Sequence, residues 1–241
     1  MTRASGLDAG TAVVWHARCR RADPGAQRRA HRAVVRQILA TVTGIPEPDL
    51  PIVVAPGGKP GFADDAPDHV RSVHFNASHS GEHLVVACST SGPVGVDVEQ
   101  ARALDAAAVA GYALAPRERA RLSTLPDAEL PRVLLRVWTR KEALLKADGV
   151  GLARAASSLE VDFDRPPAAR ALQHSAGWPW QLYDVSPEED LTVALVTTGP
   201  VRVVHRTWGE IASADTASAE LAAGAPSAGS TSAGSAPARV S

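Results

Sequence analysis

Two short stretches near the middle of the chain carry side chains that suit metal and phosphate chemistry. In a valine-rich run, Asp97 and Glu99 are two residues apart, and the period of a strand puts both carboxylates on one face. In a strongly helical segment, Glu142 and Lys146 are four residues apart and also share a face. Mg²⁺ binds a few carboxylates, keeps some waters and completes its octahedron with phosphate oxygens. The two stretches therefore predict a site for a hard divalent cation and a phosphate group.

Each pair also has an ordinary structural explanation. A D-x-E pair is most often a polar strand end, and an exposed Glu142–Lys146 pair would stabilise a helix by only tenths of a kcal/mol. However, the valines around Asp97 indicate a buried strand, where two carboxylates are costly unless a cation compensates them. Trp138 lies on the same helical row as Glu142, which indicates that this row packs inward. The metal site is therefore the favoured interpretation of both pairs.

Together with Phe75–Ser80, these stretches resemble the three signature motifs of the 4'-phosphopantetheinyl transferase superfamily. The family patterns N-x-S-H-S/T, V/I-G-V/I-D-x-E and W-x-x-K-E-A-x-x-K occur in that order as NASHS, VGVDVE and WTRKEALLK. Gly58-Lys59-Pro60 precedes the first motif, and Gly149 and Gly151 follow the third. The resemblance covers about residues 10–205 and is greatest to the larger, surfactin-synthetase-activating (Sfp-type) group.

The resemblance implies an enzyme that transfers the 4'-phosphopantetheine arm of CoA to a serine of an apo acyl- or peptidyl-carrier protein and releases 3',5'-ADP. It implies that Asp97, Glu99 and Glu142 bind Mg²⁺, or Mn²⁺, and that Lys146 contacts the pyrophosphate. CoA is then a substrate, and the metal is the cofactor. Either Glu142 or a metal-bound water would accept the proton of the serine hydroxyl. Lys141 has two open roles, in packing or in a phosphate contact.

The resemblance also places other side chains on CoA. Ser78 and His79 are expected in a phosphate-binding loop, with a structural turn or a nucleophile–base pair as weaker alternatives, because adjacent residues rarely align a hydroxyl with an imidazole. Basic side chains suit the 3'-phosphate, although the arginines could instead form a solvated helix face. The basic candidates are Lys59, Arg32, Arg20 and Arg21.

The hydrophobic pattern predicts a mixed α/β (α+β) fold. Strands are expected at 11–17, 52–55, 73–75, 83–89, 94–99, 159–163, 180–185, 191–197 and 201–205. Helices are expected at 26–43, 105–114, 116–122 and from about 127 to 149. Residues 76–81 are expected to form a loop, and 90–93 a hairpin-like connection. The resemblance adds two similar subdomains, 1–101 and 102–212, related by a pseudo-twofold axis with the active site at their junction. The tail at 213–241 is too poor in large apolar residues to fold.

The composition gives no indication of a nucleic-acid or membrane partner. The 241-residue chain has a net charge of −1, which gives no long-range attraction to nucleic acid or to an anionic membrane. Cys19 and Cys88 match no metal-binding or disulfide framework, and no run has signal-peptide or membrane-span character. These features predict a reduced, cytoplasmic protein, and the resemblance suggests a monomer.

Carrier proteins are acidic and helical, so we expect their docking surface to be apolar with a basic rim. The predicted segment is Asp105–Leu125, which contains Arg117, Arg119 and Arg121. The length of the chain and the tryptophan of the third motif favour polyketide or nonribosomal peptide carriers. The alternative functions are a catalytically inactive homologue that binds CoA or carrier proteins, and a Mg²⁺-dependent phosphodiesterase or nuclease.

Overall fold

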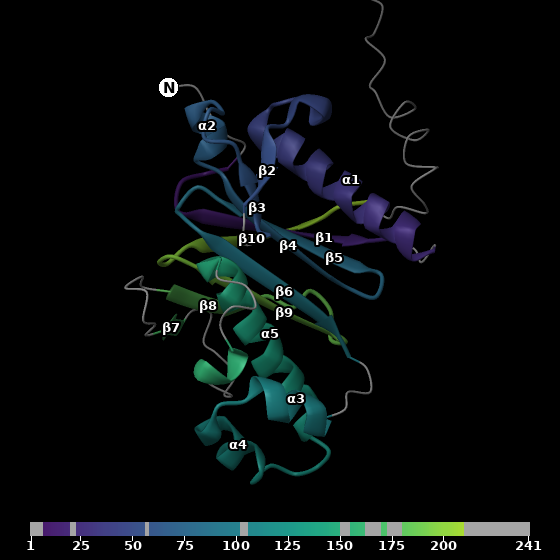
Figure 1. Cartoon of the computed structure of the whole chain (residues 1–241), viewed down its shortest axis with the longest axis vertical. Helices are drawn as coiled ribbons and strands as arrows, with labels where there is room; N and C mark the ends of the chain where they lie inside the picture. The colour runs from purple at the N-terminus through teal and green to yellow at the C-terminus, as the bar shows by residue number, and fades with distance from the viewer. Residues whose placement is uncertain are drawn as a thin grey trace, which may run out of the picture.

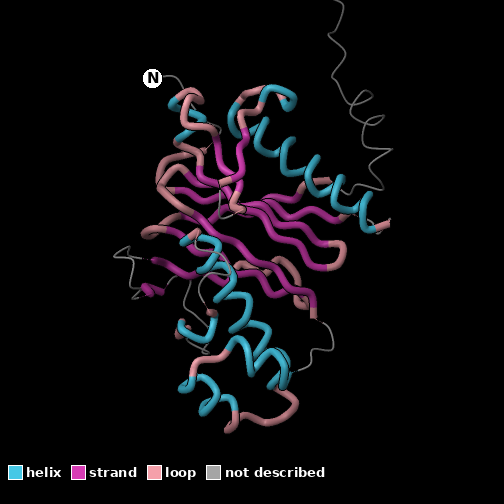
Figure 2. Tube along the Cα trace, in the orientation of Figure 1, coloured by secondary structure: helices cyan, strands magenta, loops and turns pink. Residues whose placement is uncertain are grey.

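The computed structural model describes residues 7–19, 23–55, 58–101, 106–149, 155–161, 170–172 and 180–209. Strands occupy the middle of the molecule, with α1 on one side and α3, α4 and α5 on the other (Figures 1 and 2). In chain order the elements are β1 (Thr11–Arg18), α1 (Pro24–Thr43), β2 (Ile52–Val54), β3 (Pro60–Phe62), α2 (Asp68–Arg71), β4 (His74–Ser80), β5 (His83–Ser89), β6 (Val94–Gln100), α3 (Ala106–Ala113), α4 (Pro116–Leu122), α5 (Leu130–Asp148), β7 (Arg170–Leu172), β8 (Trp180–Asp184), β9 (Leu191–Thr197) and β10 (Arg202–Thr207). The predicted mixed α/β class is confirmed.

The first sheet has the strand order β10-β1-β5-β4. The pairs β1–β5 and β5–β4 are antiparallel, and β10 returns from the end of the chain to pair in parallel with β1. Helix α1 covers one face, where Val34 and Ile38 pack with Leu84 and Val86 of β5. The carboxylate of Asp23 starts this helix by accepting hydrogen bonds from the first-turn backbone N–H groups.

The second sheet is antiparallel, in the order β6-β9-β8-β7. Helix α5 lies across β6 and β9, and its Ala143 and Leu144 pack with Ala194 and Val196. The closest approach is at Gly95, where an added Cβ would lie 2.1 Å from the carbonyl oxygen of Ala143. The glycine of the second motif therefore allows the helix that carries the third motif to lie directly on the strand that carries the carboxylates.

Side chains, rather than backbone ladders, join the two sheets at β4 and β6. The backbone N–H of Val96 donates to Asn76 Oδ1 (2.9 Å), and that of Gln100 donates to Ser80 Oγ (3.1 Å). Behind this seam, a shared core includes Val14 and Val85 of the first sheet and Val98 of the second. The seam holds the first and second motifs side by side.

Three local expectations are wrong. The predicted loop at 76–81 is mostly strand, because β4 continues to Ser80 and pairs with β5 along its whole length. Residues 90–93 do not form a hairpin, since β5 and β6 belong to different sheets. Residues 159–161 lie outside any strand. Strands β3 and β7 were not expected. The tail at 213–241 falls outside the described residues.

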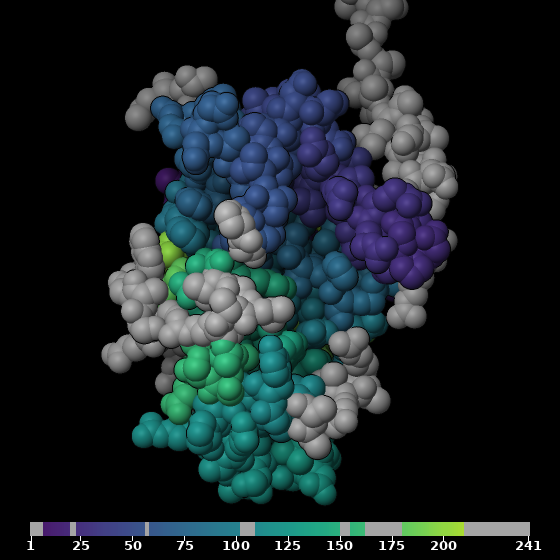
Figure 3. Space-filling view, in the orientation of Figure 1, coloured from purple at the N-terminus to yellow at the C-terminus, as the bar shows by residue number. Residues whose placement is uncertain are grey.

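The space-filling view shows the N-terminal residues, in purple and blue, above the teal and green residues of α3–α5 (Figure 3). The two halves predicted on either side of residue 101 exchange strands: β6 of the first half lies in the second sheet, and β10 of the second half completes the first sheet. The division into two subdomains stays a prediction. Cys19 and Cys88 are buried and free. Among the described residues, no helix is both long enough and apolar enough to cross a membrane.

Candidate active site

The carboxylates of β6 meet the third-motif lysine of α5. The valines of β6 point into the core between the sheets, so the alternating Asp97 and Glu99 face the other way. Lys146 Nζ donates to Asp97 Oδ1 (2.6 Å) and to Ser78 Oγ (2.8 Å). The Ser78 hydroxyl in turn donates to Asp97 Oδ1 (2.7 Å). All three sequence motifs therefore contribute one side chain each to a single cluster.

Glu99 is fixed by two donors from other elements. Ser80 Oγ of β4 donates to Glu99 Oε2 (2.9 Å), and Trp138 Nε1 of α5 lies 3.3 Å from Glu99 Oε1. Sequence reasoning missed both contacts. The two-residue spacing of Ser78 and Ser80 could have indicated the Ser80 contact, because it matches the spacing of the two carboxylates that these hydroxyls contact. Trp138 thus orients a carboxylate in addition to filling space.

The Asp97 carboxylate could hold a cation. Its side chain is 5% exposed, and its Oδ2 accepts no hydrogen bond from any residue that the structure describes. A buried carboxylate oxygen without a partner is costly. Burial raises the pKa of Asp97, and Lys146 opposes that shift. A divalent ion on Oδ2 would supply the missing partner and favour the ionised form.

Glu142 adds a third carboxylate from α5. Burial raises the pKa of its half-buried carboxyl group, and so does the charge of Asp97, whereas Lys146 lowers it. The charges of Asp97 and Glu99 both reach Glu142, so the three acids share one electrostatic environment with a single lysine. They do not close into a tight set of ligand atoms. Such an open arrangement suits Mg²⁺, which keeps waters and phosphate oxygens in its shell.

Lys141, next to Glu142, points away from this cluster. Its side chain is 0% exposed, and its ammonium group contacts Glu118 of α4. It also donates to the carbonyl oxygens of Ala113 (2.7 Å) and Ala156 (3.2 Å). Of the two roles left open by the sequence, this geometry favours packing, because an enclosed ammonium group with three acceptors has no access to a phosphate.

Ser78 and His79 of the first motif point to different faces of β4. Ser78 lies in the carboxylate cluster, while the ring of His79 packs against that of His31 in α1, with 4.6 Å between the centroids. Alternation along a strand explains this divergence. Burial, together with the charge of His79, lowers the pKa of His31 to about 4. Arg32 follows His31 in α1 and is exposed. One motif can therefore serve two separate parts of a long ligand.

The ammonium group of Lys59 is engaged by backbone carbonyls. Nζ donates to the carbonyl oxygens of Lys146 (2.5 Å) and Ala147 (3.2 Å) at the end of α5, and lies 3.4 Å from that of Val94. Lys59 also lines a hollow of about 210 Å³ together with Asn76 and Lys146. In this structure, Lys59 holds the end of α5 beside the cluster of Asp97, Ser78 and Lys146. Arg20 and Arg21, also predicted to bind CoA, fall outside the described residues.

Comparison with known proteins identifies the family. The model of the 4'-phosphopantetheinyl transferase superfamily matches residues 93–196, which contain the carboxylates of β6 and all of α5. The chain is 30% identical over 171 residues to 4'-phosphopantetheinyl transferase HetI of Nostoc sp., and the match covers 70% of each chain. The chain belongs to the 4'-phosphopantetheinyl transferase superfamily.

Two Bacillus relatives agree with the resemblance noted from the motifs. The chain is 27% identical over 174 residues to 4'-phosphopantetheinyl transferase psf-1 of Bacillus pumilus, covering 71% of each. It is 26% identical over 171 residues to 4'-phosphopantetheinyl transferase ffp of Bacillus subtilis, covering 68% of this chain and 73% of the relative. The predicted enzyme class is confirmed: the superfamily transfers the phosphopantetheine group of CoA to carrier proteins.

Proposed function

We propose that this transferase works with Mg²⁺ held by Asp97, Glu99 and Glu142, and that Mn²⁺ can replace it. The observation that supports this most strongly is the buried Asp97 Oδ2, which has no partner among the described residues although Oδ1 has two. The oxygen-only donor set matches hard cations. When bound, the ion would neutralise charge that develops on the CoA pyrophosphate.

The neighbouring side chains can bind the pyrophosphate and accept a proton. Lys146 Nζ and Ser78 Oγ lie 2.8 Å apart and offer adjacent donors for phosphate oxygens. Glu142 lies in the same electrostatic environment as Asp97 and Glu99, and we assign to it the proton of the attacking serine hydroxyl. The oxygen of that serine would bond to the β-phosphorus of CoA as the bond to 3',5'-ADP breaks.

The other end of CoA would lie toward α1. His79 faces this helix and packs against His31, and Arg32 is the next residue along α1. An imidazole and a guanidinium group suit a terminal phosphate. We therefore assign His79 and Arg32 to the 3'-phosphate, and Ser78 and Lys146 to the pyrophosphate. Lys59, Arg20 and Arg21 stay predictions for the same substrate.

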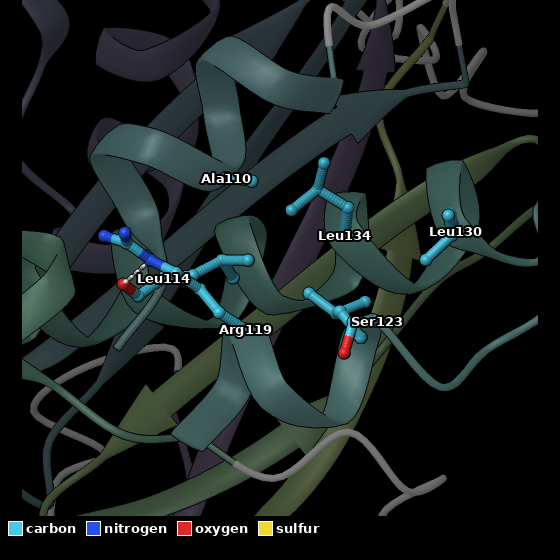
Figure 4. Close-up of a pocket in the computed structure, with 7 residues that line it drawn as sticks. Ala110, Leu114, Arg119, Ser123, Leu130 and Leu134 are labelled. Carbon is cyan, nitrogen blue, oxygen red and sulfur yellow. Dashed lines mark hydrogen bonds between the residues drawn. The ribbon is translucent and has the colours of Figure 1, made fainter. Parts of the chain in front are cut away.

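We propose that a groove between α3, α4 and α5 is the carrier-protein docking surface (Figure 4). It has a volume of about 290 Å³, and its lining is apolar except for Ser123 and Arg119. Arg117 and Arg121 of α4 are exposed, which gives the predicted basic character for an acidic helical partner. Arg119 donates to the carbonyl oxygens of Leu114 and Gly111, so it also holds α3 against α4.

Charge reversal tests this docking surface. Arg117→Glu and Arg121→Glu should raise KM for the carrier protein while leaving KM for CoA unchanged, because neither residue is placed near CoA. Arg119 is a poor choice for this test, since its loss would disturb the helix contacts themselves. Unchanged turnover of the carrier by the double variant would refute the assignment of this surface.

The natural carriers that we propose are those of polyketide or nonribosomal peptide synthases. The Sfp-type length and the tryptophan of the third motif support this choice. It predicts turnover of peptidyl and polyketide carriers at least as fast as that of fatty-acid carriers. The monomeric state and the cytoplasmic location stay predictions from the sequence.

The test is the intact mass of a purified apo carrier protein after incubation with the enzyme, CoA and Mg²⁺. We expect a gain of one phosphopantetheine group, which EDTA abolishes and restored Mg²⁺ recovers. Asp97→Asn and Glu142→Ala should abolish the gain, while Glu129→Gln, at an exposed position just before α5, should not. CoA binding without any mass gain on peptidyl, polyketide or fatty-acid carriers would instead support an inactive binder, and hydrolysis of CoA alone would support a phosphodiesterase.

A further inference from the structure

A second cluster of metal-ligand atoms lies apart from the transferase site. His16 of β1 and His83 of β5 are diagonal neighbours, because His16 pairs with Val85 and His83 pairs with Arg18. Their Nε2 and Nδ1 atoms are 2.9 Å apart. Glu188, between β8 and β9, brings Oε1 to 3.8 Å from His16 Nδ1. One ligand atom from each of the three residues lies within 4.8 Å of the other two.

The two imidazoles are largely enclosed. His83 is 2% exposed, and the side chain of His16 is 11% exposed. The rings are nearly parallel, with 10° between their planes. A pair of neutral rings shares one hydrogen between the facing nitrogens, so one of these nitrogens already presents a lone pair.

We propose that His16, His83 and Glu188 bind a divalent transition-metal ion, for which Zn²⁺ is the probe. Two imidazoles and one carboxylate are a common zinc ligand set, with a fourth position left for water. Tetrahedral geometry with Zn–N of about 2.0–2.1 Å places the two nitrogens roughly 3.3 Å apart, and they are already 2.9 Å apart. When the ion binds, the ring that donates the shared hydrogen would change tautomer and carry that hydrogen on its other nitrogen.

The donor atoms separate this ion from the one proposed at Asp97. Imidazole nitrogen favours zinc, copper and nickel, whereas Mg²⁺ requires oxygen. The side chain of Glu188 is 43% exposed, and its 3.8 Å contact is with His16 Nδ1, whereas His16 Nε2 is the nitrogen that faces His83. To share an ion held between the two rings, Glu188 has to turn toward the Nε2 side of His16, within a cluster whose ligand atoms lie within 4.8 Å of one another.

An ion at this position would join three elements that lead to the transferase site. It would connect β1, β5 and the β8–β9 loop. That loop is bonded to the end of β6 through the Ala101 N–H and the Asp190 carbonyl oxygen (2.8 Å). His83 also pairs with Ser80, which donates to Glu99. The expected effect of the ion is therefore to stabilise the fold around Glu99, without taking part in the reaction.

The test is Zn²⁺ titration of the full chain by calorimetry and by thermal unfolding, in excess Mg²⁺ so that the oxygen site is filled. We expect one Zn²⁺ per chain and a higher unfolding midpoint. Glu188→Gln should weaken Zn²⁺ binding by on the order of tenfold, because a charged ligand is lost. The neighbouring, exposed Glu189→Gln is the matched control and should bind Zn²⁺ like the wild type.

Two further variants guard against an indirect effect. His16→Gln should also lose Zn²⁺ binding, and Asp97→Asn should retain it. Equal affinities for the wild type, Glu188→Gln and His16→Gln would overturn the proposal, as would loss of the ion in Asp97→Asn. The readouts do not involve phosphopantetheine transfer, so the result is independent of the proposed function.

Discussion

The buried pair of Lys141 and Glu118 gives the sharpest prediction about the third motif. Lys141 is fully enclosed and Glu118 is 4% exposed. Glu118 also accepts hydrogen bonds from the backbone N–H groups of Ala115 (2.8 Å) and Val161 (2.9 Å). The pair thus connects α5, the start of α4 and the segment that follows α5. We predict that the double replacement costs clearly less than the sum of the two single replacements.

The magnitude follows from the burial of both charges. Replacing Lys141 with Met leaves a carboxylate enclosed without its counter-ion, which costs about 3–5 kcal/mol. Glu118→Gln leaves an enclosed ammonium group and costs a similar amount. The double variant removes both charges, so its loss should fall short of the sum of the single losses by about 2 kcal/mol or more. Because a domain has only about 5–15 kcal/mol of stability, each single loss is large.

The assay is urea unfolding of the four proteins at neutral pH, with the free energy of unfolding compared in a double-mutant cycle. As a second readout, Lys141→Met should keep kcat/KM within a few-fold of the wild type at a temperature where it is folded, because the ammonium group does not reach the substrate. Single losses below about 1 kcal/mol, or strictly additive losses, would refute the buried-pair reasoning. A large fall in kcat/KM without any loss of stability would instead support a phosphate contact for Lys141.

Three other perturbations follow from the same contacts. Gly95→Ala should lower the free energy of unfolding in urea by about 3 kcal/mol or more, because the added Cβ would meet backbone atoms of α5. Transfer activity should also be lost, and near-wild-type stability would contradict the close approach. The folded-state pKa of His31, about 4, is below its unfolded value, so unfolded chains bind more protons between the two values. Stability should be full above about pH 6.5 and fall by on the order of 3 kcal/mol toward pH 4, and His31→Leu should flatten that fall. Trp138→Phe should raise the Mg²⁺ concentration needed for half-maximal transfer severalfold while KM for CoA stays constant, since Glu99 loses one donor.

Local patterns in the sequence predicted the elements that have strong local signals. Helix α4 begins at Pro116 and ends at Leu122, as predicted, because proline suits the first turn of a helix. Strands β5 and β9 also have the predicted bounds, since both are long apolar runs. The three motifs meet in one cluster, with Lys146 on Asp97 and Ser78 beside them, and the metal and CoA roles of these residues stay predictions.

What sequence reasoning missed depends on contacts between distant segments. Asn76 and Ser80 are turn-forming types, so the stretch looked like a loop, yet their side chains accept hydrogen bonds from β6 across the seam. Glu118, the partner of Lys141, lies 23 residues earlier in the chain. Helix and strand periods do not predict a contact at that separation. The return of β10 to β1 is likewise a long-range pairing, which a short apolar run does not specify.

The central claim, that Asp97, Glu99 and Glu142 hold a divalent cation, is tested most directly by Mn²⁺ binding. The electron paramagnetic resonance signal of free Mn²⁺ disappears on binding, so its amplitude during a titration gives stoichiometry and affinity. We predict one Mn²⁺ per chain that Mg²⁺ displaces, with binding strongly weakened in Asp97→Asn and in Glu142→Gln and unchanged in Glu129→Gln. Mn²⁺ bound with wild-type affinity by both Asp97→Asn and Glu142→Gln would contradict the account.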